Sequence, residues 1–134
     1  MAYLCERIKN RNQAYEIRIL ECRSLDSLAV VPEEVNGLPV TELAPYAFSS
    51  HEDCNANPPG ETFWWPWEED SQEQPVLNGN RLEELRLPSS LKKVGAYAFY
   101  NCENIKKMEL YSTTLDWGAG VFTGCIGVEE LIIH

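Results

Sequence analysis

The sequence lacks the features that define several large functional classes. No run of about 18 apolar residues is present, so the chain has no candidate transmembrane helix. Basic residues are scarce, with 11 Lys and Arg against 21 Asp and Glu, and the net charge is −10. Nucleic acids and anionic membranes are bound by clustered Lys and Arg, so the charge argues against both partners. We expect the acidity to serve solubility or, as the alternative, to dock a basic partner.

Histidine is scarce as well, and the five cysteines contain no CxxC pair. An odd number of cysteines at irregular spacing is typical of neither a zinc site nor a disulfide framework, so we expect no metal and no other cofactor. Most of the thiols are expected to be small buried apolar groups. Cys5 and Cys22 lie on or beside neighbouring candidate strands, where a disulfide is conceivable and two free thiols are favoured.

Known catalytic motifs are absent from the sequence. It contains neither a phosphate-binding loop nor a G-x-S-x-G elbow. The carboxylate runs at 33–34 and 68–70 lack a companion base and are interpreted as solvated charge. A Cys54 nucleophile beside His51 and Asp53 is a weak alternative, as is a calcium site in the acidic run. We therefore predict that the chain is not an enzyme and has no catalytic residues.

The second half of the chain, residues 82–134, contains a 23-residue repeat. Its copies begin at Leu82, Ile105 and Val128, at intervals of 23 residues (105 − 82 and 128 − 105). The matched positions include Leu85, Met108 and Leu131; Leu87, Leu110 and Ile133; Phe99 and Phe122; and Cys102 and Cys125. Repetition at a fixed period indicates a solenoid, in which each coil buries its apolar face against the next.

Each copy is expected to form one coil of strand followed by a short helical turn. The alternation of Leu85 and Leu87 places both side chains on the inner face of a strand. Pro88 then ends the strand, because it has no N–H to continue the ladder. Residues 96–101 are expected to form about one helical turn that points Phe99 into the core. Stacked in one orientation, the strands predict a parallel sheet.

The first half contains a degenerate copy and a cap, which together with the repeats predict a single domain over the whole chain. The degenerate copy covers residues 25–54 and aligns Phe48 with Phe99. It is longer by five residues around the Asn-Gly pair at 36–37, a dipeptide typical of tight turns. Residues 3–22 alternate in hydrophobicity on either side of a polar stretch and are predicted to form a β-hairpin that caps the first coil.

An insertion rich in Trp and Pro, residues 55–81, interrupts the repeat and is predicted to be a loop, because no helix or strand period holds there. It contains Phe63, Trp64, Trp65 and Trp67. Each ring can bury about 150–250 Å². At roughly 25 cal/mol per Å², leaving all four rings exposed to water would lose more than about 10 kcal/mol of hydrophobic stabilisation. The rings should therefore be covered. Either the loop folds back onto the side of the solenoid, or the rings bind a partner, with a carbohydrate as a minor version of that idea.

The outer face of the predicted sheet is a second candidate binding surface. Its columns are Glu83, Lys106 and Glu129; Glu84, Lys107 and Glu130; and Arg86, Glu109 and Ile132. Neighbouring strands lie about 4.8 Å apart, so each Lys would stand between two Glu residues and Arg86 beside Glu109. We expect these charges to satisfy one another, which favours a structural role over a ligand site.

The last strand, 131–133, carries Ile132 on its outer face and has unpaired backbone groups along an apolar edge. Such an edge invites pairing with another chain. We expect it to be covered, either by a second subunit in a homodimer or by further residues of a longer chain.

The repeats resemble the BspA-type leucine-rich repeats. The resemblance rests on the pattern I/L-x-x-L-x-L-P-x-S-L-x-x-I/V-G-x-x-A-F-x-x-C and on VPEEVNGLPVTELAPYAF, which is similar to a first repeat of that family. It covers roughly residues 15–54 and 82–134. It implies an α/β fold, namely a right-handed leucine-rich-repeat solenoid with short parallel strands and short helical turns, often found in bacterial surface and host-interaction proteins.

The function predicted from these features is a non-catalytic protein–protein interaction scaffold with an unidentified protein partner. The alternatives are a purely structural or self-associating repeat unit and, more remotely, a surface adhesin or carbohydrate-binding module. The amino terminus does not resemble a secretory signal. This predicts a cytoplasmic location if Met1 is the native start, and an extracellular one otherwise.

Overall fold

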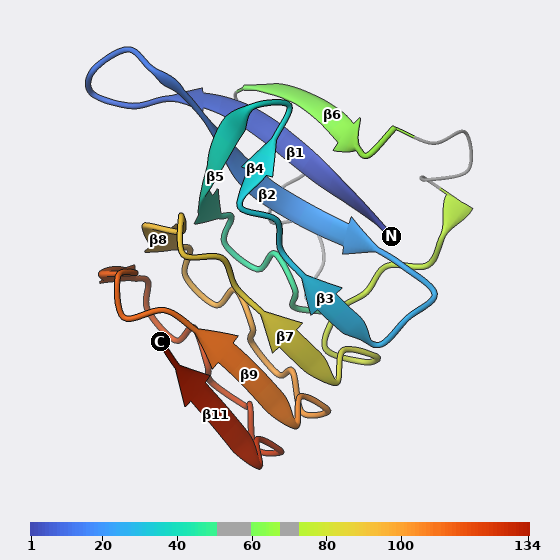
Figure 1. Ribbon diagram of the computed structural model, residues 1–134. Coiled ribbons are helices and arrows are strands. Elements are labelled where there is room, and N and C mark those ends of the chain that lie inside the picture. The colour runs from blue at the N-terminus through green and yellow to red at the C-terminus, as the bar shows by residue number, and fades with distance from the viewer. Residues whose placement is uncertain (51–59, 68–72) are drawn as a thin grey trace.

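The computed structural model describes residues 1–50, 60–67 and 73–134, which fold as a β-solenoid of stacked coils (Figure 1). The strands are β1 (Ala2–Lys9), β2 (Tyr15–Arg23), β3 (Leu28–Val30), β4 (Glu34–Val35), β5 (Leu38–Leu43), β6 (Glu61–Trp65), β7 (Glu84–Arg86), β8 (Lys93–Val94), β9 (Lys107–Leu110), β10 (Asp116–Trp117) and β11 (Glu130–Ile133). The front sheet has the order β11-β9-β7-β3, and the back sheet has the order β10-β8-β5-β2-β1-β6, with β4 beside β5. Successive coils contribute one strand to each sheet.

The front sheet is parallel and keeps the period of the repeat. Glu84 pairs with Lys107, an offset of 23 residues (107 − 84), whereas Leu28 pairs with Glu84 at an offset of 56 (84 − 28). The longer offset accommodates β6 and the β4–β5 hairpin. In that hairpin Asn36 and Gly37 have φ of 54° and 81°, as a tight Asn-Gly turn requires.

The segment after each short back-sheet strand is a chain of turns, not the helical turn expected over 96–101. Ala98 donates its N–H to Gly95 within its own turn, but Phe99 donates to Val121 of the next coil. Two non-glycine residues of this segment also have positive φ, which an α-helix excludes. The expectation of an α/β fold with short helical turns is therefore wrong, since the described residues contain no α-helix. Within these same ranges, no helix has the length and apolarity needed to cross a membrane.

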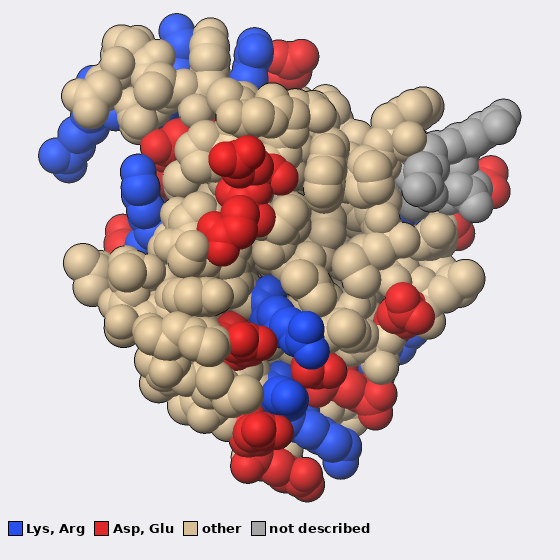
Figure 2. All heavy atoms as spheres, in the orientation of Figure 1, with Lys and Arg blue, Asp and Glu red and all other residues tan. Residues whose placement is uncertain are grey.

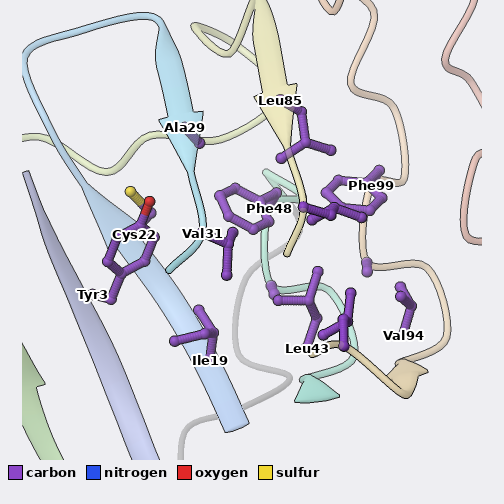
Figure 3. Packing of buried hydrophobic residues seen from close by; sticks show 14 of the residues in the cluster. Tyr3, Ile19, Cys22, Ala29, Val31, Leu43, Phe48, Leu85, Val94 and Phe99 are labelled. Carbon is purple, nitrogen blue, oxygen red and sulfur yellow. The ribbon is translucent and has the colours of Figure 1, made fainter. Parts of the chain in front are cut away.

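A column of phenylalanine rings runs through the coils, and two of its members, Phe48 and Phe99, lie in the core (Figure 3). The rings of Phe48 and Phe99 stack with centroids 5.5 Å apart, and those of Phe99 and Phe122 stack at 5.7 Å. This confirms the alignment of the three positions in the repeat. The coil backbones also approach closely, because a Cβ built on Gly95 would lie 2.4 Å from the backbone nitrogen of Pro45.

The amino end of the solenoid is covered by the antiparallel β1–β2 hairpin, whose second strand lies parallel to β5 in the back sheet. The buried inner face of the hairpin includes Cys5, Ile17, Ile19 and Cys22. Both thiols are free, as favoured from the sequence. Burial raises the pKa of each of them to about 12, so they behave as small apolar groups.

Candidate partner-binding surfaces

The segment predicted to be an irregular loop, 55–81, contains a strand. Residues 61–65 form β6, which pairs antiparallel with β1 and is the edge strand of the back sheet. The expectation that no strand period holds there is wrong. Threonine and aromatic residues favour extended backbone, and the partner that makes the strand stable, β1, lies far away in the sequence.

Alternation along β6 sends its aromatic side chains in different directions. Phe63 and Trp65 pack against the core. Trp64 stands between them, and the guanidinium carbon of Arg23 lies 5.5 Å from its ring centroid. Trp67, just beyond the strand, is 70% exposed. Phe63 and Trp65 therefore pack on the solenoid, as one of the two alternatives for this insertion expected. Trp67 is exposed and available for contact with a partner.

A partly buried ion-pair network of Glu6, Arg18 and Glu42 supports the start of β6 through a hydrogen bond to Gly60. Glu6 has no exposed surface, and its carboxylate accepts the Gly60 N–H at 2.7 Å and pairs with Arg18 at 2.8 Å. Arg18 also pairs with Glu42 at 2.8 Å. Burial works to lower the pKa of Arg18, but the carboxylates of Glu42 and Glu6 raise it above its usual range, so the guanidinium stays charged.

Sequence reasoning missed this network, although a signal for it exists. Glu6 and Arg18 are directly opposite each other in the β1–β2 hairpin. Their pairing would follow from the hairpin register if the position of the turn were fixed in advance. Gly60 is the third part of the arrangement, since a Cβ there would lie 2.8 Å from the Glu6 side chain.

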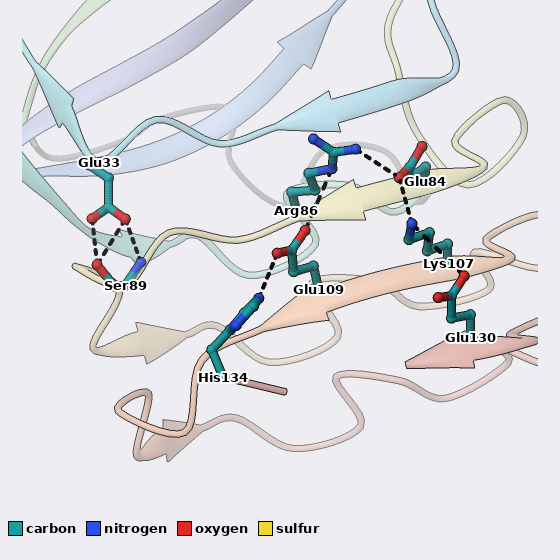
Figure 4. A network of polar contacts seen from close by, with 8 residues as sticks. All are labelled: Glu33, Glu84, Arg86, Ser89, Lys107, Glu109, Glu130 and His134. Carbon is teal, nitrogen blue, oxygen red and sulfur yellow. Dashed lines mark hydrogen bonds and ion pairs between the residues drawn. The ribbon is translucent and has the colours of Figure 1, made fainter. Parts of the chain in front are cut away.

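The outer face of the front sheet carries mutually paired charges, as the repeat predicted (Figure 4). The Lys107 ammonium lies 3.9 Å from a carboxylate oxygen of Glu84 and 3.9 Å from one of Glu130. Arg86 lies 3.6 Å from Glu109 and 3.3 Å from Glu84. Figure 2 shows the two signs interleaved over this part of the surface. These charges largely satisfy one another, which leaves little for a charged ligand.

Glu33 joins the first coil to the second and is not the simply solvated charge expected (Figure 4). Its carboxylate accepts the backbone N–H of Ser89 at 2.8 Å and of Ser90 at 3.0 Å, together with the Ser89 hydroxyl at 2.8 Å. Partial burial tends to raise the pKa of Glu33, but these hydrogen bonds outweigh it and hold that pKa below its usual value. The contact therefore acts as a clamp between coils.

Large apolar side chains are exposed at the carboxyl end of the solenoid. Leu131 and Ile133 are in register with two buried core residues of β9, yet they are 53% and 60% exposed because β11 is an edge strand. Phe122, at the end of the ring column, is 38% exposed. We call these three residues the carboxyl-end face. Ile132 lies on the opposite face of β11, in the column of Glu109, and is partly buried.

In residues 1–50, 60–67 and 73–134, no cluster of His, Cys, Asp and Glu is arranged to hold a metal ion. The weaker sequence candidates, His51, Asp53, Cys54 and the acidic run at 68–70, lie outside the described residues.

Comparisons with known proteins agree with the repeat architecture. The family model described as BspA type leucine rich repeat region (6 copies) matches residues 73–134. The leucine rich repeat protein TpLRR of T. pallidum is similar in structure, with a TM-score of 0.62 and 21% identity over 96% of this chain and 46% of that one. A leucine rich cell surface protein from Faecalibacterium prausnitzii A2-165 gives a TM-score of 0.56 and 18% identity over 98% of this chain and 32% of that one.

At these identities the two structures show the fold alone. The chain spans less than half the length of either solved protein. A comparison with curated proteins finds no match.

Proposed function

Residues 73–134 are a BspA-type leucine-rich repeat region, and from that premise we propose that the chain is a non-catalytic scaffold that binds a protein partner at the β6 edge of its back sheet. The solenoid provides a rigid frame, and β6 presents aromatic side chains at the frame's edge. The observation that carries the proposal is Trp67, which is 70% exposed beside an edge strand whose Phe63 and Trp65 rings pack against the core.

The chemistry of this edge suits a protein partner. Trp and Arg are the residue types most enriched at the energetic centres of protein interfaces. Trp67 offers a large exposed ring, and the guanidinium of Arg23 lies over the ring of Trp64 on β6. Phe63 and Trp65 hold the strand in place from below. Because the base is already ordered, little conformational entropy is lost when a partner binds.

The front sheet is the weaker candidate on physical grounds. Its charges are paired across adjacent strands, so a ligand would have to replace interactions that are already made. Each such exposed pair contributes only about 0–1 kcal/mol to stability, but breaking several of them together opposes binding.

The test compares Trp67→Ala with Leu115→Ala, a matched control because Leu115 is 85% exposed and directly precedes β10, at the opposite end of the back sheet from β6. Proteins captured by the wild-type chain are identified, and the affinity of each purified candidate is then measured by calorimetry for all three chains. We expect Trp67→Ala to weaken binding of the partner at least about tenfold, and Leu115→Ala to leave it unchanged. Equal affinities for wild type and Trp67→Ala, with equal unfolding midpoints, would exclude this edge as the binding surface.

A further inference from the structure

The tip of the β1–β2 hairpin extends beyond the rest of the back sheet and is basic. Among the described strands, β6 pairs with β1 only as far as Arg7, and β5 pairs with β2 only from Ile17. The segment between them, residues 8–16, projects outward (Figure 1). Residues 7–15 contain three exposed basic residues and no Asp or Glu, so they carry +3, whereas the rest of the chain carries −13 (−10 − 3). Figure 2 shows Lys and Arg gathered over this turn.

The cations of the tip are held in place by an aromatic ring. Tyr15 lies directly opposite Lys9 in the hairpin. The guanidinium carbon of Arg7 lies 4.3 Å from the Tyr15 ring centroid, and the Lys9 ammonium lies 5.1 Å from it. In the turn, the Asn10 side-chain carbonyl accepts the Asn12 N–H at 2.8 Å. A ring attracts cations without neutralising them, so the tip presents positive charge on an ordered surface.

Carboxylates of the chain match little of this charge. On the front sheet, by contrast, Lys107 lies between two carboxylates. Within the described part of the chain, Lys9 and Arg11 form no ion pair, and Arg7 pairs with Glu61 at 2.9 Å. An external carboxylate that reaches the tip therefore meets two cations for which it does not have to displace an internal partner.

We propose that the hairpin tip binds an acidic segment of a protein partner, in extended conformation and with carboxylates at alternate residues. Arg7 and Lys9 are two residues apart on one strand, so their Cα atoms are separated by about 6.6 Å. Alternate residues of an extended segment have the same spacing, so two carboxylates can reach both cations at once. This surface lies at the opposite end of β6 from Trp67, because β6 runs antiparallel to β1. It is therefore independent of the binding edge proposed above.

The small size of the basic surface favours a short acidic segment over a large polyanion. At physiological ionic strength, exposed charges interact over about 8 Å. A group that contacts the tip alone is therefore little affected by the acidic remainder of the chain. A nucleic acid or an anionic membrane covers a wider area and brings its phosphates close to that remainder, whose charge is −13 (−10 − 3).

The first experiment is an NMR titration of the isotope-labelled chain with a capped hexapeptide of alternating glutamate and threonine. We expect saturable amide shifts centred on residues 7–15. Raising the salt concentration from about 20 mM to about 200 mM should weaken binding about tenfold, because exposed ion pairs are screened. An absence of saturable shifts at the lower salt concentration, or shifts centred on another surface, overturns the proposal.

Two double variants of equal net charge separate the tip from the overall charge. Lys9→Gln with Arg11→Gln and Lys106→Gln with Lys107→Gln both change the net charge from −10 to −12 (−10 − 2). At about 0.1 M salt, where the screening length is about 10 Å, we expect the first to bind the peptide at least about tenfold more weakly and the second to bind it as wild type does. Equal urea midpoints establish that both are folded. An equal loss of affinity in the two variants overturns the proposal.

Two further ligands test the chemistry of the partner. A hexapeptide of the same composition, with its three glutamates consecutive, should bind more weakly, because consecutive side chains of an extended segment point to opposite sides. A thymidine tetranucleotide, which carries three phosphates, should also bind more weakly than the alternating peptide. Equal affinity for the two peptides overturns the alternate spacing, and tighter binding of the tetranucleotide overturns an acidic protein segment as the partner.

Discussion

Replacing Arg18 by Met should strongly destabilise the fold, because Glu6 would lose the cation that compensates its buried charge. Glu6 has no exposed surface, and Arg18 lies 2.8 Å from it. Removing one partner of a buried pair costs about 3–5 kcal/mol. The Arg18 side chain is 27% exposed, so water reaches the gap and we expect the lower end, about 3 kcal/mol. With an unfolding entropy of roughly 2.1 cal/mol/K per residue, that loss lowers Tm by roughly 10 °C.

Urea denaturation of four chains tests the reasoning. Arg86→Met is the matched control, since Arg86 is 46% exposed and its pairs lie on the surface. It should cost less than about 1 kcal/mol. Glu6→Gln combined with Arg18→Met should recover at least half of the loss, because the amide is neutral and still accepts the Gly60 N–H. If Arg18→Met costs no more than Arg86→Met, or if Glu6→Gln brings no recovery, the buried-charge argument is refuted.

Three further predictions follow from the coil contacts and the thiols. Glu33→Gln should lower the free energy of unfolding by about 1 kcal/mol at pH 7. Because the pKa of Glu33 is lowered in the folded state, this stabilisation is present above the unfolded pKa of about 4.3 and is lost as pH falls through the folded pKa. The urea denaturation curves of wild type and Glu33→Gln should therefore converge in acid. Cys5, Cys22 and Cys102 are buried with pKa raised to about 12, so peptide mapping after a thiol reagent at pH 8 should find them labelled only in unfolded protein. Gly95→Ala should cost about 3 kcal/mol in thermal unfolding, because a Cβ there would lie 2.4 Å from the backbone of the preceding coil; an unchanged Tm would contradict that clash.

The features that the sequence predicted well all follow from the repeat. A 23-residue period places Lys107 between Glu84 and Glu130, because residues one period apart become neighbours in a parallel sheet. The same period stacks Phe99 on Phe122. Such contacts need only the period and the alternation of side chains along a strand, so no knowledge of distant parts of the chain is required.

The features that were missed depend on partners outside the repeat. The turns after each back-sheet strand were expected to be helical because their composition suits a helix, but every second N–H donates to the next coil, and local sequence does not show that alternative. β6 was missed because its partner β1 lies about sixty residues earlier in the sequence. The buried pair of Glu6 and Arg18 depends on the register of the β1–β2 hairpin. That register cannot be deduced from the sequence, because the polar stretch between the strands does not show where the turn lies.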